Sequence, residues 1–312
     1  MITRQLAKTI VASRSGNRNE YFKELVVEGR EYGLRIFRNI VQGLTGKGEQ
    51  QAGEVAARLI GSVLCDEENM ENYSALTFHL LAEGLDCSCF FWQTLMEHPD
   101  NNNFIAQICH AIDLLQERCF KPPFLEDSQN TLTIVERDCF YGMICFMSQL
   151  FYEKELHLVS FEMIIENVLN GYMLAQFILQ GQQDNRDHFL AGIKLVWQIS
   201  MIVDVTSDQL IIVRPADDPL TLLRVIMNIE LLKEPVGGYM CMMILQVLLK
   251  RDPAYLAKLV ELQIFDKLLA VFDSCSQCGD SKQLHLESIE LAAELLRAAK
   301  AVGDETRIFG IM

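Results

Sequence analysis

The sequence predicts an all-α protein, a right-handed α-solenoid of stacked antiparallel helical hairpins. Glycine and proline, which interrupt helices, number 18 and 7 among 312 residues. Together they make up about 8 % of the chain, below the roughly 12 % of average usage. Apolar residues recur three and four positions apart through most of the chain, as one face of a helix requires. The best candidate strand, QLIIV at 209–213, is interpreted as a short helix or an extended connector.

Three regions are expected along the chain. Residues 1–18 are predicted to form an N-terminal helix or arm, because Ile2, Leu6 and Ile10 share one helix face and a polar break follows. Residues 19–250 are predicted to form the helical-repeat domain, which opens with helices over about 20–28 and 31–44. Residues 251–312 are predicted to add C-terminal hairpins that continue the array.

Residues 56–98 are expected to hold a helix, an acidic turn and two further helices. Asn69 is a predicted N-cap for the second helix, since its side chain can accept a hydrogen bond from a free first-turn N–H. This helix is apolar on two faces, so we expect it to pack on two sides. The two faces are formed by Tyr73, Leu76 and Leu80, and by Phe78, Leu81 and Leu85. Pro99 is predicted to end the third helix.

The rest of the chain reads as helix after helix with short connectors. The apolar spacing predicts helices over about 101–119, 137–152, from 160 onward, and over 173–179, 186–203, 219–232, 238–250, 254–272 and 281–301. Glu234-Pro235 and Asp252-Pro253 predict helix boundaries. Consecutive helices joined in this way pack as antiparallel hairpins. Because no strict period occurs, a HEAT-like or armadillo-like array is favoured over tetratricopeptide repeats; a compact irregular helical domain is the alternative.

The cysteine pattern and the N-terminus indicate a cytoplasmic protein, with a nuclear location as the alternative. Ten cysteines are scattered along the chain, and its first fifteen residues lack the apolar core of a secretion signal. Such cysteines are typical of reduced thiols that act as small buried hydrophobes. No run of 18 apolar residues occurs, so no membrane span and no membrane partner are predicted.

The net charge of −15 is unevenly distributed. Residues 1–50 carry 9 basic and 5 acidic side chains, residues 51–200 carry 7 and 21, and residues 201–312 carry 11 and 16. A strongly acidic middle repels nucleic acid and suits a basic protein partner. We therefore expect protein partners and no DNA, and only the basic N-terminal segment is a candidate for contact with phosphate.

Two groups of charged residues are candidate binding faces. The acidic turn is a candidate face for a basic partner and consists of Asp66, Glu67, Glu68 and Glu71. The basic N-terminal helices are a candidate face for RNA or an acidic partner and carry Arg14, Arg18, Arg30, Arg35 and Arg38. The alternative interpretations are a helix start, where negative charge is stabilising, and a solvated helix face.

Two blocks of sequence, residues 55–96 and 138–169, contain motifs that are shared with a known family. The first block contains an acidic turn that leads into a helix of the form Y-x-x-L…L. The second contains a phenylalanine-rich helix, a charged turn with leucines and a helix that closes a hairpin. The matching positions are Tyr73, Leu76 and Leu80 in the first block, and Phe146, Leu150, Phe151, Leu156 and Ile165 in the second. At these positions the two blocks resemble the middle domain of eukaryotic translation initiation factor four-G, a HEAT-type helical-repeat family.

The resemblance implies a non-catalytic adaptor in translation or messenger-RNA metabolism. The implied partner is a DEAD-box helicase or another translation factor that docks on the ends of helical hairpins. RNA-binding members of the family have a strongly basic surface, whereas this domain is acidic. Protein partners are therefore favoured over RNA.

No local pattern indicates a catalytic, cofactor or metal site. Cys275 and Cys278, with His285 nearby, supply only part of the four ligands that a structural zinc ion requires. The other close pair, Cys87 and Cys89, has a C-x-C spacing at a predicted helix start. We therefore expect a protein that is not an enzyme, with no cofactor and no bound metal.

Two further features are interpreted as structural. The glycines and lysine near residues 43–47 lack the spacing and the Ser or Thr of a phosphate-binding loop. The methionines at 227, 240, 242 and 243 have the adaptable side chains of a binding groove, but their spacing is more typical of a helical core. The sequence leaves two alternative functions open: an armadillo-like scaffold in signalling, meiosis or trafficking, and an RNA-binding solenoid that uses the basic N-terminal helices.

Overall fold

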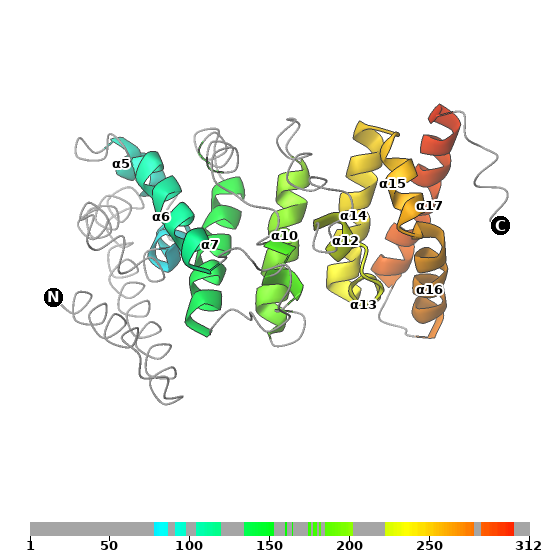
Figure 1. Ribbon diagram of the computed structural model, residues 1–312, viewed down its shortest axis with the longest axis horizontal. Coiled ribbons are helices and arrows are strands. Elements are labelled where there is room, and N and C mark those ends of the chain that lie inside the picture. The colour runs from blue at the N-terminus through cyan, green and yellow to red at the C-terminus, as the bar shows by residue number, and fades with distance from the viewer. Residues whose placement is uncertain are drawn as a thin grey trace, which may run out of the picture. The chain divides into compact units, whose positions relative to one another are not determined.

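The structure of the chain is a computed structural model (Figure 1). It describes residues 78–86, 91–97, 104–119, 134–152, 160, 164, 174–175, 177–179, 181, 185–201, 222–277 and 282–302. Within these ranges the backbone is helical apart from short turns and contains no strand. The all-α prediction is therefore confirmed for them, while the stacking into a right-handed solenoid stays a prediction. Among the described helices, none combines the length and apolar character needed to cross a membrane.

The chain divides into a first unit, Met1–Leu169, and a second unit, Asn170–Met312. In the first unit the structure describes the helical segment 78–86 and three helices, α5 (Phe91–Glu97), α6 (Phe104–Cys119) and α7 (Ile134–Tyr152). The predicted domain boundaries at residues 18 and 250 stay predictions. The predicted connector at 209–213 lies outside the described residues.

Aromatic side chains form the core of the first unit. The Phe146 ring on α7 lies 5.6 Å from the Trp92 ring on α5 and 6.0 Å from the Phe78 ring, measured between centroids. All three side chains are fully buried. The Trp92 Nε1–H donates to Ser160 Oγ at 3.1 Å, so the buried indole keeps a polar partner, as buried tryptophans usually do. Burial of these large rings holds the segment 78–86, α5 and α7 together.

The segment 78–86 packs on two sides, as the sequence predicts. Leu80, from one predicted face, and Phe78, Leu81 and Leu85, from the other, are each at most 3 % exposed. Glycine at position 84 is required by close packing, because an added Cβ would lie within 2.7 Å of three Phe91 ring atoms. The other two predicted face residues, 73 and 76, lie outside the described residues.

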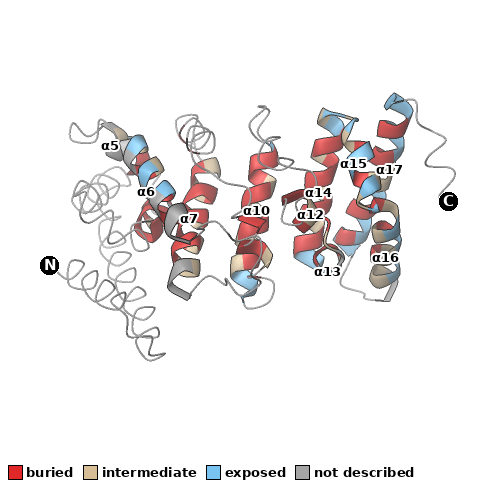
Figure 2. Cartoon of the chain, viewed as in Figure 1, coloured by how far each residue is buried: buried red, intermediate tan, exposed pale blue. Residues whose placement is uncertain are grey.

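Several described helices of the second unit pack against α14 (Pro235–Arg251). The described helices of this unit are α10 (Arg186–Met201), α12 (Leu222–Ile226), α13 (Ile229–Leu232), α14 (Pro235–Arg251), α15 (Tyr255–Glu261), α16 (Ile264–Gln277) and α17 (Lys282–Val302). Helix α14 lies between α10 and α17 and contacts both. Figure 2 shows that α10 and α14 are buried along most of their length, whereas α15–α17 carry exposed residues. Helix α14 is therefore the central helix of this unit.

The ends of α14 lie at the two predicted proline boundaries, although the helix begins at Pro235 and not at the predicted residue 238. The Glu234 carboxylate accepts a hydrogen bond from the Gly237 backbone N–H, and Pro235 occupies the first turn. Both are favourable at a helix N-terminus, where backbone donors lack partners. Lys250 and Arg251 lie in the last turn, where positive charge is stabilising. The predicted boundaries at both proline pairs are confirmed.

The single helix predicted over 219–232 is wrong, because two short helices occupy the described part of it. Helix α12 ends at Ile226 and α13 begins at Ile229. Asn228 lies between them, and its Oδ1 accepts a hydrogen bond from the Glu230 N–H at 3.0 Å. Asparagine at this position caps a new helix, since its side chain replaces the backbone acceptor that a first turn lacks.

The single helix predicted over 254–272 is also wrong. Helix α15 ends at Glu261 and α16 begins at Ile264. Gln263 has a φ of 61°, in the left-handed region, and its N–H donates to the Val260 carbonyl at 2.9 Å. A left-handed residue ends a helix; the sequence gives no sign of this break because glutamine rarely adopts that conformation.

Candidate protein-interaction surface

The charged residues that the sequence predicts as candidate binding faces lie outside the described residues. They are Asp66, Glu67, Glu68 and Glu71 in the acidic turn, and Arg14, Arg18, Arg30, Arg35 and Arg38 in the N-terminal helices. Both faces stay predictions. Of the residues that carry the family resemblance, Leu80, Phe146 and Leu150 are buried in the core and Phe151 is half-buried.

Helix α17 has an inner face that packs into the second unit. Helices α14, α15 and α16 all contact it. The buried residues of the inner face are Leu284, Glu287, Ser288, Leu291, Glu294, Leu295, Ala298 and Ala299. Their spacing of three and four positions places them on one side of the helix. This face fixes α17 and thereby fixes the direction in which its opposite face points.

The opposite face of α17 is an exposed stripe with a regular pattern. Leu286, Ile289 and Leu296 are 48 %, 48 % and 47 % exposed, and Ala293 between them is half-buried. Exposed lysines, Lys282 and Lys300, continue the same line at both ends. We call these six residues, at positions 282, 286, 289, 293, 296 and 300, the exposed stripe. Their spacing of 4, 3, 4, 3 and 4 is that of the a and d positions of a coiled coil.

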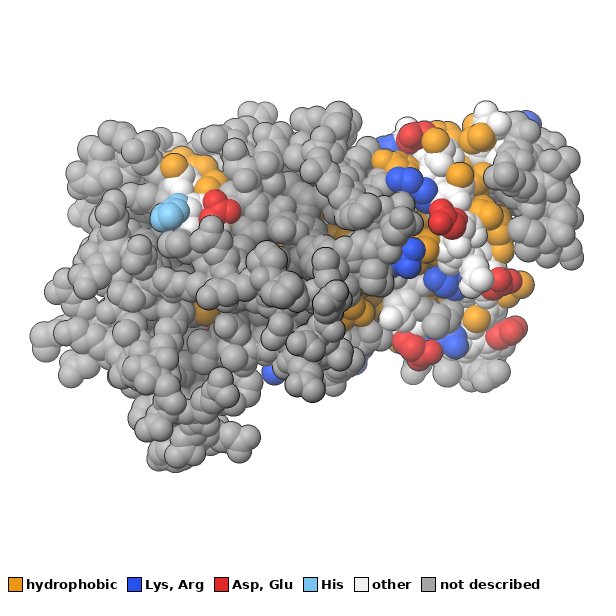
Figure 3. All heavy atoms as spheres, in the orientation of Figure 1, with side chains coloured by type: hydrophobic (Ala, Val, Ile, Leu, Met, Phe, Trp, Pro, Cys, Tyr) orange, Lys and Arg blue, Asp and Glu red, His pale blue; other side chains and the backbone are white. Residues whose placement is uncertain are grey.

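Helix α16 adds apolar surface on one side of this stripe. The Phe272 ring on α16 meets the His285 ring on α17 edge to face, with centroids 5.4 Å apart. Leu269, three residues before Phe272, is 63 % exposed. In Figure 3 hydrophobic side chains lie exposed beside charged ones over α15–α17. Scattered apolar residues are ordinary on a protein surface, whereas a large contiguous apolar patch is typical of an interaction site.

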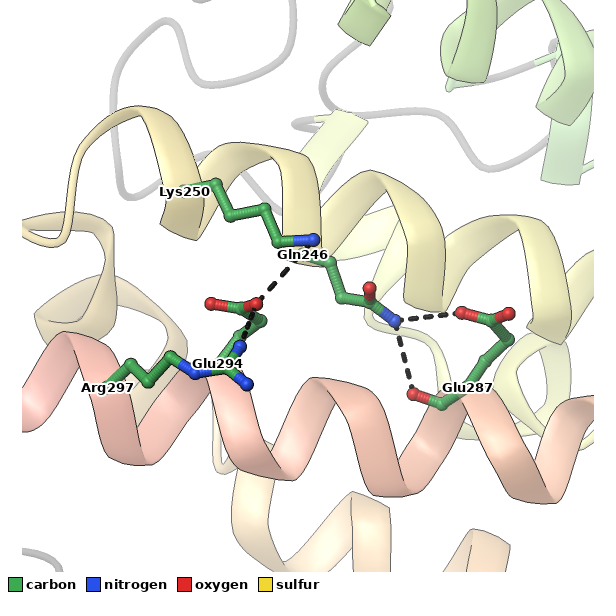
Figure 4. A network of polar contacts seen from close by, with 5 residues as sticks. All are labelled: Gln246, Lys250, Glu287, Glu294 and Arg297. Atoms are coloured by element: carbon green, nitrogen blue, oxygen red, sulfur yellow. Dashed lines mark hydrogen bonds and ion pairs between the residues drawn. The ribbon is translucent and has the colours of Figure 1, made fainter.

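A cluster of polar side chains, shown in Figure 4, joins α17 to α14 beneath the exposed stripe. The Gln246 Nε2 donates to Glu287 Oε2 at 2.9 Å and to the Glu287 carbonyl oxygen at 3.2 Å. One turn further along α14, Lys250 Nζ lies 3.5 Å from Glu294 Oε1. Arg297 also pairs with that carboxylate. The cluster therefore ties both carboxylates of the inner face of α17 to defined partners.

Because Glu287 and Glu294 are buried, loss of their hydrogen-bond and ion-pair partners would be energetically costly. Glu287 and Glu294 are 8 % and 9 % exposed, and Gln246 is 5 % exposed. A buried carboxylate that loses its hydrogen-bond donors costs more than the bond itself contributes, because its lost hydration is not replaced. The pairing thus selects one register between α14 and α17.

Comparison of the whole chain with models of protein families, with curated proteins and with solved structures finds no match. Among the described residues, no three His, Cys, Asp or Glu side chains gather closely enough to hold a metal ion. Cys278, Cys87 and Cys89 of the zinc interpretation lie outside those residues.

Two thiols have raised pKa values that keep them protonated at neutral pH. Burial raises the pKa of Cys241, and the nearby Glu234 carboxylate raises it further. Burial also raises the pKa of Cys109, with a second contribution from Asp113. Because the thiolate is the reactive form, these raised pKa values oppose a nucleophilic role for Cys109 and Cys241.

The methionines near α14 are divided between core and surface. Met227 and Met242 are fully buried, which confirms for these two the interpretation as core residues. Met240 and Met243 are half-buried. The apolar spacing predicts a helix over 281–301 without separating its two apolar faces. The regular spacing of residues 282–300 is the sequence signal for the exposed face.

Proposed function

We propose that this chain is a non-catalytic helical-repeat adaptor that binds protein partners in messenger-RNA translation or messenger-RNA metabolism. The observation that carries the proposal is the exposed stripe of α17, a regular apolar row on a helix whose other face is already packed. A helix with two apolar faces is typically covered on both. A second packed layer or a partner protein would therefore bury Leu286, Ile289 and Leu296.

The assignment to messenger-RNA processes rests on the resemblance of residues 55–96 and 138–169 to the middle domain of initiation factor four-G. A DEAD-box helicase or another translation factor is the partner that this resemblance favours. The net charge of −15 supports protein partners over nucleic acid, since acidic proteins repel phosphate. A cytoplasmic location, with the nucleus as the alternative, belongs to the same proposal.

Affinity purification from cell lysate, with and without nuclease, tests this function when the recovered proteins are identified by mass spectrometry. We expect a DEAD-box helicase, cap-binding factors or poly(A)-associated factors to be retained after nuclease treatment. A coherent set of proteins from signalling, meiosis or trafficking would replace the proposal with an armadillo-like scaffold of that pathway. Loss of every partner with nuclease would assign binding to RNA and make Arg30, Arg35 and Arg38 the residues to mutate.

A further inference from the structure

We propose that the exposed stripe of α17 binds an amphipathic helix of a partner protein, one with large apolar residues in its middle and carboxylates at both ends. This inference rests on the adaptor function proposed above and adds the surface and the chemistry of the partner. The stripe consists of Lys282, Leu286, Ile289, Ala293, Leu296 and Lys300. Each feature of the partner follows from one feature of this stripe.

The partner is inferred to be a helix because of the spacing of the stripe. Alternating steps of three and four residues keep side chains in one line along a helix that pairs with another helix. Helix α17 has 21 residues, and the stripe spans 19 of them, from 282 to 300. An extended peptide would instead seek unpaired backbone groups at a sheet edge, and α17 has its backbone groups bonded within the helix.

The middle of the stripe selects large apolar side chains on the partner. Leu286, Ile289 and Leu296 project methyl groups, while Ala293 leaves a shallow position between Ile289 and Leu296. A leucine or methionine of the partner that faces Ala293 would fill this position, since well-packed interfaces set large residues against small ones. On one side, Phe272 of α16 contacts His285 of α17 and extends the apolar contact area.

The two lysines decide the charge of the partner and exclude a second copy of this chain. Lys282 and Lys300 are exposed, and neither forms an ion pair with a described residue. In a parallel pair of α17 helices each lysine would face its own copy, and in an antiparallel pair Lys282 would face Lys300. Like charges in these positions oppose association, and opposite charges favour it. Carboxylates at both ends of the partner helix complement the stripe.

The inner face of α17 prepares this surface for binding. Gln246 and Lys250 of α14 hold Glu287 and Glu294, so the helix and its register are set before a partner arrives. Because α17 does not have to fold or shift on binding, less conformational entropy is lost. A rigid helix of this kind also places its end charges at a fixed separation, which strengthens their selectivity.

Two synthetic helical peptides of roughly three heptads test the proposal, both with leucine at the central a and d positions. One peptide carries glutamate at both ends and the other carries lysine. Fluorescence anisotropy is measured with the full chain, at concentrations where each peptide is monomeric. We expect the glutamate-ended peptide to bind at least about tenfold more tightly than the lysine-ended peptide, a ratio that corresponds to roughly 1.4 kcal/mol.

Three variants make the test specific to the stripe. The double variant Lys282→Glu and Lys300→Glu is expected to reverse the preference, so that the lysine-ended peptide binds more tightly. The double variant Ile289→Asp and Leu296→Asp is expected to abolish binding of both peptides. Val236→Asp is the control, since Val236 is 40 % exposed on α14 and an acidic residue near a helix N-terminus is tolerated. It is expected to leave binding unchanged.

Other occupants of the stripe give different results, and each would overturn the proposal. A dimer in sedimentation equilibrium that the aspartate double variant dissociates would assign the stripe to a second copy. Peptide binding that occurs only after deletion of residues 303–312 would assign it to that segment. Equal binding of both peptides, or none, would remove the stripe as a selective site. Peptide selectivity together with partners from another pathway would leave this inference intact and overturn only the messenger-RNA assignment.

Discussion

Gln246 joins α14 to α17 through two hydrogen bonds to Glu287. Its amide donates to both the side chain and the backbone of Glu287, and both residues are nearly fully buried. The remaining donor to this carboxylate is Gln283, with Nε2 at 3.3 Å from Oε1. A buried polar pair contributes little net stability, yet removal of one member is costly because the other keeps its desolvation penalty.

Replacement of Gln246 by leucine is expected to lower the free energy of unfolding by about 1–3 kcal/mol, since Glu287 would lose its buried donor. Urea denaturation followed by circular dichroism measures the change. Gln283→Ala is the matched control: this glutamine is exposed, so its loss should cost less. Adding Glu287→Leu to Gln246→Leu should recover most of the stability. An additive double variant would contradict the coupling of the two side chains.

Lys267 is a half-buried cation whose pKa is lowered, first by burial and then by the nearby Arg224. A lysine with a lowered pKa in the folded state binds its proton more weakly there than in the unfolded chain. Folding is therefore expected to become more favourable as pH rises towards the ordinary lysine range near 10.5. Lys267→Met should stabilise the protein at pH 7, by under about 1 kcal/mol because the site is partly solvated.

Thermal unfolding of wild type and Lys267→Met between pH 7 and pH 10 measures this effect. The advantage of the variant should shrink as pH rises, because the wild-type lysine loses its proton. Lys258→Met is the control, since Lys258 is an exposed lysine on the neighbouring helix α15. A constant difference in stability between wild type and the Lys267 variant across this pH range would show that the charge of Lys267 does not affect stability.

At the scale of helices, the break between α15 and α16 depends on Gln263 in its left-handed conformation. Glycine adopts this conformation without a steric penalty, whereas a residue with a Cβ does not. Gln263→Gly is therefore expected to raise the free energy of unfolding by roughly 0.5–1 kcal/mol. Gln283→Gly, in the exposed first turn of α17, removes the same side chain from a helical position and should destabilise by up to about 1 kcal/mol.

Chemical denaturation of both glycine variants tests this expectation, and equal signs for the two changes in the free energy of unfolding would contradict it.

The sequence predicts most of the described helices because their apolar spacing is long and regular, as in 137–152 and 186–203. It misses the break at Gln263, since the residue type does not reveal its φ angle. It places no break at Asn228, although asparagine is a recognised N-cap residue.

The candidate surface was less predictable than the helices for a physical reason. Spacing alone shows that α17 has apolar residues all round, but only packing shows which face α14 and α16 cover. The partnership of Gln246 and Glu287 joins residues 41 positions apart, which no local pattern encodes. The charged faces that local patterns do suggest, at residues 14–38 and 66–71, lie outside the described residues.

At the scale of the whole molecule, an exposed apolar row should affect solubility more than stability. Ile289 and Leu296 are almost half exposed, so their replacement by aspartate removes little buried surface. We expect Ile289→Asp with Leu296→Asp to change the free energy of unfolding by less than about 0.5 kcal/mol per site. Binding of the dye ANS, which reports exposed apolar surface, should fall.

The same two measurements on Leu291→Asp provide the comparison with the exposed-stripe variant, because Leu291 is a fully buried residue of the same helix. That variant should unfold the second unit or lower its stability by several kcal/mol, in line with the cost of an unpaired buried charge. A large loss of stability in the exposed-stripe variant would instead show that Ile289 and Leu296 belong to the core.

The two hydrogen bonds from Gln246 to Glu287 also bear on mechanical behaviour. A slip of α17 by one turn along its axis, about 5.4 Å, would carry Glu287 away from the Gln246 amide. The amide would then lack this hydrogen-bond acceptor. Sliding therefore meets a barrier in addition to the one that apolar packing creates. Tension applied along α17 would therefore be transmitted to α14 without sliding of one helix along the other.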